Sequence, residues 1–201
     1  MTPKTKIYNE AISSCLNVYL ELFSDEVGSH TRLEKQLAQL DPAITSRKNF
    51  VGHLTASGLY YDYDQEKVLL VHHRSLDLWI QPGGHLEGFE MPSAGALREF
   101  EEETGIENIK LFDWHHTSGV PIDIDTHFIP ENKSKGELDH YHHDFLYLLI
   151  GKNINKDRPQ VEFQENELKG FCWVTLKELL EGDFESKLKR TASKVEKLLR
   201  N

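Results

Sequence analysis

Residues 83–106 read GGHLEGFEMPSAGALREFEEETGI. The stretch opens on a glycine pair and places four glutamates in the five positions from Glu99 to Glu103. Neighbouring carboxylates repel one another, which raises their pKa and opposes the helix that holds them. The whole chain already carries a net charge of −10. The cluster is therefore favourable only if a further group offsets the repulsion.

The second half of this stretch predicts an α-helix. Pro92 stands where a first helical turn tolerates proline. The residues from Ser93 to Thr104 are rich in Ala, Leu, Arg and Glu, which are all good helix formers. Gly105 follows, as is typical of a helix that ends on a glycine. We therefore expect a helix that begins beside Pro92 and ends at Thr104.

Three of the glutamates share one face of this helix. Residues three and four apart are neighbours on a helix, so Glu99 lies beside Glu102 and Glu103, while Glu101 points elsewhere. A hard divalent cation, Mg²⁺ or Mn²⁺, binds carboxylate and carbonyl oxygens and typically shares its shell with substrate phosphates. The spacing therefore predicts a metal site formed by Glu99, Glu102 and Glu103.

The residues around the helix extend this prediction. Gly83 and Gly84 allow the backbone to come close and to turn sharply, so that a carbonyl oxygen can face the same ion. Arg98 can pair with Glu102 one turn away, or with Glu90 across the loop, and either pair would hold the carboxylates in place. Glutamate-rich helices exposed to solvent are common, so REFEEET alone is weak evidence for a site.

The complete spacing is more specific than the helix alone. It resembles the Nudix box, G-x5-E-x7-R-E-U-x-E-E-x-G-U with U aliphatic or aromatic, and every fixed position from Gly84 to Ile106 matches. The flanking sequences WIQPGG, residues 79–84, and FCWVTLKELL, residues 171–180, are also similar to Nudix segments. The resemblance therefore extends over about residues 50–182.

The resemblance implies a fold and a reaction. The fold is an α/β/α sandwich with a mixed sheet, in which the box forms a loop, a helix and a loop. The reaction is Mg²⁺-dependent hydrolysis of a phosphoanhydride in a nucleoside diphosphate linked to another moiety, so the enzyme is a pyrophosphohydrolase. The matched positions imply that Glu99, Glu102, Glu103 and the Gly84 carbonyl are the metal ligands. They also imply that the three glutamates and Arg98 are catalytic, and that Glu90 and Gly83 support the site.

Two other functions share this fold. A Nudix-fold sensor binds a nucleotide derivative without turnover, but such proteins usually lose box glutamates, and this box is intact. A Nudix-fold isomerase acting on isoprenoid diphosphate uses a catalytic cysteine, and neither Cys15 nor Cys172 lies in a site motif. We favour the hydrolase and keep the sensor as the alternative. The box does not identify the substrate, because selectivity in the family comes from loops and appendages.

The remaining sequence predicts an N-terminal helical extension, residues 1–48, before a hydrolase domain, residues 49–201. In the extension, Ile7, Ala11, Cys15, Val18 and Leu22 recur at helical spacing, and a short helix follows over Thr31–Leu40. We expect it to cover a sheet edge or a dimer face. Beyond it, the pattern predicts strands over residues 51–61, 68–74, 78–80, 109–115, 122–128, 144–150 and 170–174. It predicts helices over residues 176–180 and 184–199.

Composition and charge exclude several classes of protein. A net charge of −10 disfavours duplex nucleic acid as a partner, because such binding uses basic patches. No apolar run reaches the length of a membrane span, and the N-terminus lacks the apolar core of a signal peptide. The two cysteines lie far apart, so no disulfide framework is expected. We predict a cytoplasmic protein with a nucleoside diphosphate derivative as its small-molecule partner. Many similar proteins are dimers, so a homodimer is one of the oligomeric states that the sequence leaves open.

A second polar cluster lies outside the box. Asp123, Asp125 and His127 alternate along one predicted strand, and His140, His142 and Asp144 alternate along the next. If the strands pair, all six side chains share one sheet face, which is either a wet surface or a place for metal binding or proton transfer. In similar proteins the connecting loop can supply a general base. The candidates are His142, which we rank first, with His140, His127, Glu137 and Asp139.

Overall fold

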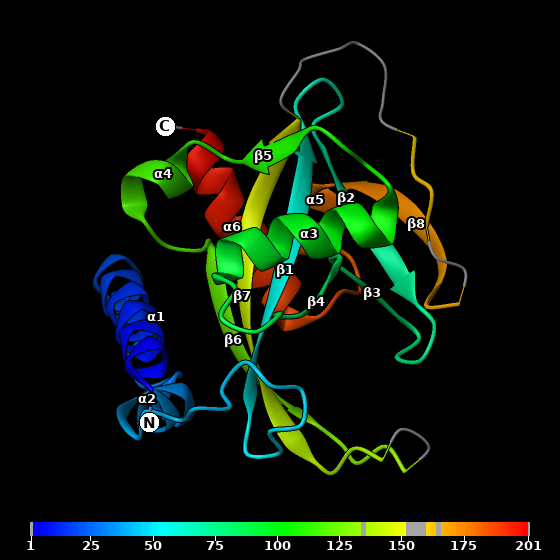
Figure 1. Ribbon diagram of the computed structural model, residues 1–201. Helices are drawn as coiled ribbons and strands as arrows, with labels where there is room; N and C mark the ends of the chain where they lie inside the picture. Colours follow the sequence, from blue (N-terminus) through cyan, green and yellow to red (C-terminus); the bar gives the residue numbers. More distant parts are fainter. Residues whose placement is uncertain (1, 134–135, 152–159, 164–165, 201) are drawn as a thin grey trace.

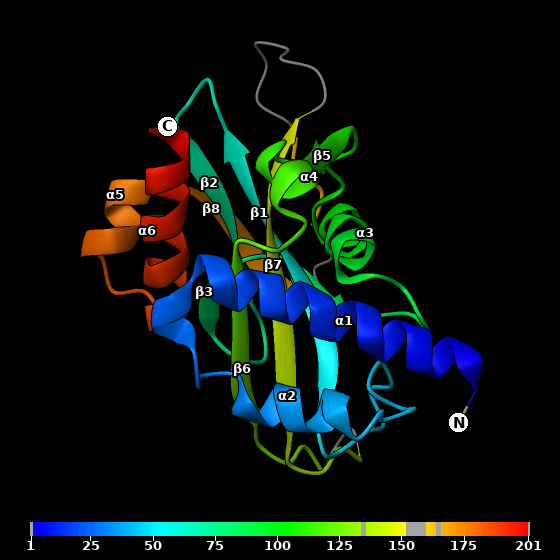
Figure 2. The same ribbon diagram turned by 90° about the vertical axis from the view of Figure 1, so that its left-hand side faces the viewer.

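A mixed β-sheet lies at the centre of the molecule, between two layers of helices (Figure 1, Figure 2). The computed structural model describes residues 2–133, 136–151, 160–163 and 166–200. The strands are β1 (His53–Asp62), β2 (Lys67–His73), β3 (Leu78–Ile80), β4 (Gly83–His85), β5 (Ile109–Leu111), β6 (Asp123–Ile129), β7 (His140–Gly151) and β8 (Leu168–Thr175). The helices are α1 (Pro3–Leu22), η1 (Ser24–Glu26), α2 (Thr31–Ala38), α3 (Pro92–Thr104), α4 (Trp114–Ser118), α5 (Leu176–Glu181) and α6 (Ser186–Leu199).

The two long strands β1 and β7 run parallel at the centre of the sheet, and every other described pairing is antiparallel. The strand order is β3-β2-β1-β7-β5, with β4 on β1, β6 on β7 and β8 on β2. Strand β1 is buried along its whole length because both of its faces are covered. The mixed sheet that the box predicted is therefore present.

The two faces of β1 pack against different helices, because successive side chains of a strand point to opposite faces. Ala56 and Tyr60 belong to the core that contains α3, whereas Leu59 and Tyr61 belong to the core that contains α5 and α6. Gly58 lies under α3, where a Cβ atom would collide with the side chain of Leu149. The molecule thus has the three layers of the predicted α/β/α sandwich.

The N-terminal helices α1 and α2 pack against the sheet on the side of β6 (Figure 2). Lys194 of α6 joins them to the domain, because its Nζ donates to the Tyr19 hydroxyl and to Asp123 Oδ1, each at 2.7 Å, and pairs with Glu26. On α2, the Gln36 side chain donates to the Gly52 carbonyl at 2.6 Å. The extension therefore packs on a face of the sheet, where its helices share one core with α3, and not only along an edge as expected.

The apolar stripe predicted for the first helix is wrong. Ile7 is 66% exposed and Leu22 is 53% exposed, although both belong to the predicted stripe. The buried side of α1 is formed instead by larger side chains at the same helical spacing, Tyr8, Ile12, Leu16 and Tyr19. Tyr19 is fully buried although it carries a polar hydroxyl, because that hydroxyl accepts from Lys194 and donates to Glu26.

The strand predicted over Ile109–His115 is present only in its first part, because β5 ends at Leu111 and α4 begins at Trp114. The cause is the imidazole of His115, which is buried. Its Nε2 accepts the Leu148 amide of β7 at 2.9 Å, and its Nδ1 donates to the Val120 carbonyl at 2.7 Å. The side chain thus satisfies an amide of β7 that a continuous edge strand would have bonded through its backbone.

The remaining expected elements are present with boundaries that shift by a few residues, and β4 was not predicted. The glycine pair lies in this short strand, so it approaches β1 closely but does not form the predicted sharp turn. A Cβ at Gly83 would lie 2.6 Å from the Ala56 carbonyl oxygen. Among the helices of the described residues, none combines the length and the apolar character that crossing a bilayer requires.

Candidate active site

Helix α3 places the box glutamates beside the glycine strand β4. Pro92 begins the helix, and Gly105 ends it in the left-handed conformation with φ of 66°. Ala96 and Phe100 are fully buried on the side of α3 that packs on the sheet, while Glu101 is exposed. The helix is therefore fixed in rotation, and Glu99 and Glu103 are directed toward β4.

The glycine strand touches both of these carboxylates. The backbone amide of Gly83 donates to Glu103 Oε2 at 3.2 Å. A Cβ atom at Gly84 would lie 2.9 Å from Glu99 Oε1 and closer still to Oε2, so only glycine leaves room for that carboxylate. Glu99 and Glu103 thus both lie against β4, whereas Glu102 is half exposed and pairs with Arg98.

Arg98 ties the carboxylates into one frame. Its Nε and Nη2 donate to the two oxygens of Glu90 at 3.1 and 2.8 Å, which is a bidentate pair. Its Nη1 donates to Glu99 Oε1 at 2.8 Å and to Glu102 Oε2 at 3.3 Å. Nη2 also donates to the His85 carbonyl at 2.9 Å. Both of the pairings considered for Arg98 are thus present together, and the arginine additionally holds β4.

The negative charges of the buried carboxylates of Glu99 and Glu103 are only partly offset by nearby donors and by Arg98. Glu103 is 8% exposed, and burial raises its pKa to about 8, with Glu99, Glu167 and Glu102 adding to the shift and the Gly83 amide opposing it. Burial also raises the pKa of Glu99, against the effect of Arg98. Oxygen donors gathered around a glycine cradle, with more negative charge than Arg98 offsets, fit a hard divalent cation. Glu167, which lies just before β8, was missed because nothing in the sequence relates it to the box.

The N-terminal extension reaches this site. The Tyr8 hydroxyl of α1 donates to the Glu90 carbonyl at 2.7 Å, and its ring packs edge-on against Phe89 at a centroid distance of 5.5 Å. The loop that carries the Arg98 partner is therefore held from outside the domain. This contact had no signal in the sequence, because Tyr8 and Glu90 are 82 residues apart along the chain.

The second polar cluster forms on the face of the sheet opposite α3. Strands β6 and β7 pair antiparallel, which was the condition for the shared polar face, and Asp125 lies opposite Asp144 and His127 opposite His142. His140 joins them, since its Nε2 lies 3.2 Å from His142 Nε2. His127 Nδ1 lies 2.9 Å from Asp125 Oδ2. The three histidines proposed from the sequence are therefore brought together.

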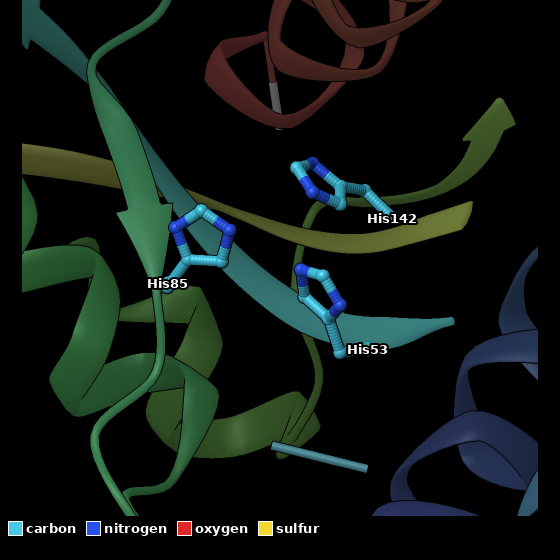
Figure 3. A group of neighbouring side chains, drawn as sticks. All are labelled: His53, His85 and His142. Carbon is cyan, nitrogen blue, oxygen red and sulfur yellow. The ribbon is translucent and has the colours of Figure 1, made fainter. Parts of the chain in front are cut away.

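Two further histidines complete the cluster. Because β1 runs parallel to β7, His53 is paired with His142, and β4 brings His85 opposite Thr55. The rings of His53 and His142 have centroids 4.7 Å apart, and those of His53 and His85 have centroids 5.0 Å apart. Figure 3 shows the imidazoles of His53, His85 and His142 turned toward one another. Nothing in the sequence relates His53 and His85 to this cluster, because their approach depends on the pairing of distant strands.

Burial keeps these imidazoles neutral near neutral pH. It lowers the pKa of His142 to about 2 and that of His85 to about 4, with neighbouring histidines adding to both shifts. Burial likewise lowers the pKa of His53. Since neutral imidazole is a ligand and an acceptor rather than a cation, the cluster does not supply positive charge to a phosphate.

The two acidic candidates lie at the margin of the cluster. Glu137 pairs with Arg47 at 3.0 Å, and both charges act weakly on the pKa of His53 and His85. Asp139 is exposed just before β7. Asp123, which shares the strand face, belongs instead to the ion pairs with Arg190 and Lys194 of α6. The polar residues of the two strands therefore do not form one site: the histidines cluster together, and Asp123 belongs to a structural ion network.

Buried polar groups continue from the histidines toward the box on the same face. Asp144 accepts hydrogen bonds from Thr55 at 3.0 Å, from Ser57 at 2.7 Å and from Gln81 at 3.3 Å. Ser57 and Gly83 are paired residues of β1 and β4, and the Gly83 amide donates to Glu103. The histidine cluster and the glutamate cluster thus lie on opposite faces of the sheet but share the strand β4.

Comparison with known proteins gives one family. The model of the NUDIX domain matches residues 52–195. The chain is 36% identical over 103 residues to the m7GpppN-mRNA hydrolase NUDT17 of Bos taurus, which covers 50% of this chain and 32% of that protein. It is 36% identical over 115 residues to a probable DHNTP pyrophosphohydrolase of Lactococcus lactis subsp. cremoris (strain MG1363), with 57% and 58% covered. The chain thus spans about a third of one relative and just over half of the other.

Solved structures agree on the fold. A hydrolase of the NUDIX family from Clostridium perfringens superposes with a TM-score of 0.51 at 22% identity, covering 73% of this chain and 97% of that one. An Ap4A hydrolase from C. elegans, solved as a binary complex, superposes with a TM-score of 0.51 at 18% identity over the same shares. At these identities the likeness concerns the architecture of the domain.

Proposed function

We propose that this chain, which belongs to the NUDIX domain family as its box predicted, is a pyrophosphohydrolase that cleaves a phosphoanhydride in a nucleotide derivative with the help of Mg²⁺ or Mn²⁺. The observation that supports it most is the contact of two buried box glutamates with the glycine strand. Glu99 fills the space that Gly84 leaves, and Glu103 accepts from the Gly83 amide. A solvated acidic helix would not bury carboxylates in this way.

The residues divide into ligands and a frame. Glu99, Glu102, Glu103 and the Gly84 carbonyl would hold the cation, and Arg98 with Glu90 would keep the carboxylates in position. The bound ion would neutralise charge on the phosphates and lower the pKa of a bound water. Glu103 would give up its proton to become a ligand, and the gain of an ion would compensate the cost of the buried charge. An acidic protein would thus bind an acidic substrate through cations.

The general base is proposed among the box glutamates and the histidines, with His142 first among the histidines. His142 faces His85, which adjoins Gly84 in β4, so this imidazole is near the strand that borders the glutamates. A base must come within hydrogen-bonding reach of the attacking water, directly or through one water. The low pKa of His142 makes it a weak base as the structure stands, which leaves Glu103 as its main competitor.

We expect His142→Ala to lower turnover or to shift its pH profile more than His127→Ala or His140→Ala does. Initial rates measured from about pH 5 to pH 9 at saturating metal would show the difference. His116, which is exposed on α4, offers the matched control His116→Ala. If all three cluster variants keep wild-type kinetics over that range, the base lies within Glu99, Glu102 and Glu103.

The substrate and the sensor alternative can be tested together. The relatives are named for hydrolysis of m7GpppN-mRNA and of DHNTP, and RNA pyrophosphohydrolases also match. A panel would therefore contain capped RNA, DHNTP, triphosphorylated RNA, nucleoside diphosphate sugars, dinucleoside polyphosphates, ADP-ribose and damaged nucleotides. Each compound would be followed by thermal shift for binding and by chromatography for products. A compound that binds without being cleaved would favour the sensor.

A further inference from the structure

We propose that His53, His85 and His142 form a second metal site, which takes a transition-metal ion of the Zn²⁺ class and is separate from the box carboxylates. Three strands supply the ligands: β1, β4 and β7 (Figure 3). One ligand atom from each histidine lies within 4.8 Å of the corresponding atoms of the other two. The three imidazoles are thus gathered around one point before any ion binds.

The backbone under these side chains is already fixed. His53 pairs with His142 across β1 and β7, and Thr55, two residues along β1, pairs with His85 of β4. A Zn–N distance of about 2.0–2.1 Å requires ligand nitrogens about 3.4 Å apart in a tetrahedral site. The ligand nitrogens would therefore close by at most about 1.4 Å, a distance that rotation of the side chains about their own bonds can cover.

The hydrogen bonds leave the required nitrogen free at His53. This side chain is fully buried, and its Nδ1 lies 3.1 Å from the Asn49 carbonyl, to which it donates. Its Nε2 is buried and has no hydrogen-bond partner among the described residues. Metal-binding histidines characteristically donate their other nitrogen to a carbonyl or carboxylate, which fixes the tautomer and the ring. The Asn49 carbonyl therefore already holds the His53 ring as the ring of a metal ligand is held. Burial of the unpartnered Nε2 is costly, and a bound metal ion would compensate that cost.

A fourth imidazole stands next to the three. His140 Nδ1 lies 2.6 Å from the Leu138 carbonyl, and its Nε2 lies 3.2 Å from His142 Nε2. Its ring stacks on His53 at a centroid distance of 4.9 Å. His140 therefore neighbours the site, but it lies outside the group of three whose ligand atoms are all within 4.8 Å of one another.

The donor set separates this site from the box. Imidazole nitrogens suit Zn²⁺, Cu²⁺, Ni²⁺ and Fe²⁺, whereas Mg²⁺ takes oxygen ligands and keeps its waters. The two sites lie on opposite faces of the sheet and meet only through β4, where His85 follows Gly84. An ion at the histidines would hold β4 against β1 and β7, and with it the glycine carbonyl of the box. A metal-bound His142 could not accept a proton, so zinc would also remove any role of this residue as a base.

Calorimetric titration of the full chain with ZnCl₂ tests the site without any substrate. The protein should carry no affinity tag and should be stripped with a chelator beforehand. We expect one Zn²⁺ per chain, bound even in excess Mg²⁺, and a rise in the melting temperature on binding. His53→Ala and His142→Ala should each weaken binding by about 100-fold or more, since each removes a ligand. His116→Ala, at an exposed histidine of α4, should bind as the wild type does.

Two further measurements make the outcome decisive. The double variant Glu99→Gln/Glu103→Gln should keep zinc binding, because the histidine site does not use the box. Co²⁺ in place of Zn²⁺ should give the intense visible absorption bands of a tetrahedral site with nitrogen ligands. These bands should be lost in His142→Gln, a milder substitution that replaces His142→Ala if the alanine variant unfolds. Zinc binding that survives His53→Ala and His142→Ala, or that is lost with the box glutamates, would overturn the proposal. The result is independent of whether any substrate is turned over.

Discussion

Replacement of Glu103 by glutamine is expected to lower Mg²⁺-supported turnover by about 100- to 1000-fold while the fold is kept. The change conserves size and removes one anion, so the cation would lose a ligand and the phosphates would lose part of their charge stabilisation. Metal stabilisation of this kind is worth several kcal/mol, and each 1.36 kcal/mol is a factor of about ten in rate. Initial rates at saturating Mg²⁺ and circular dichroism of the same sample would check both parts of the prediction.

Glu101 provides the matched control for this variant. It lies on the same helix, two residues away, but is exposed to solvent. Glu101→Gln removes the same charge from the chain and should leave turnover within about twofold of the wild type, because surface charges contribute little. Wild-type turnover of Glu103→Gln at ordinary Mg²⁺ concentrations would contradict the assignment of Glu103 as a ligand.

The same variant should change how stability depends on pH. Glu103 has a pKa of about 8 in the folded protein, above its value in the unfolded chain. Between the two values the folded state binds more protons, so wild-type stability decreases as pH rises through this window. Glutamine does not titrate. In metal-free buffer, the melting temperature of Glu103→Gln should therefore exceed that of the wild type by a margin that grows from about pH 5 to about pH 8.

Deletion of residues 1–45 is expected to expose the core and to cause aggregation. Ile12, Leu16 and Tyr19 of α1 are each at most 2% exposed, and they pack in the same core as Phe145 of β7. Isolated helices of this length are marginal, so the extension and the sheet depend on each other. Size-exclusion chromatography and binding of a hydrophobic dye would detect the exposed surface.

A point variant separates packing from chain length. Leu16→Ala should reduce the free energy of unfolding by about 2–5 kcal/mol, as is usual for a buried leucine. Ile7→Ala is the control, because Ile7 lies on the same helix and is 66% exposed. A truncated chain that stays soluble, monomeric and fully active would show that the extension has no structural role.

The parts of the fold that follow from local spacing could be predicted from the sequence. The helix of the box, its capping by Pro92 and Gly105, and the frame around Arg98 all lie within one short stretch, where the distance between residues sets the geometry. The alternation of polar residues along β6 and β7 likewise predicted that these side chains share one sheet face if the strands pair, and the two strands do pair antiparallel. In both cases the residues that meet are joined by one helix or one hairpin.

The parts that depend on distant pairing could not be predicted. His53 reaches His142 only because β1 and β7 run parallel, a register that no spacing in the sequence specifies. His115 ends a strand because its imidazole binds an amide of β7. The buried side of α1 was misplaced because aliphatic residues lie on two sides of this helix. The side that packs is the one that also carries Tyr8 and Tyr19, whose hydroxyls find partners elsewhere in the chain.

Hydrolysis of the substrate panel as a function of free Mg²⁺ tests the central claim most directly. The protein would be stripped with a chelator, and product formation would be followed by chromatography while Mg²⁺ is added back. We predict that at least one phosphoanhydride is cleaved, that cleavage is absent without the cation, and that Glu99→Gln and Glu103→Gln abolish the response to Mg²⁺. Cleavage that proceeds without a divalent cation, or no cleavage of any compound that the protein binds, would contradict the account.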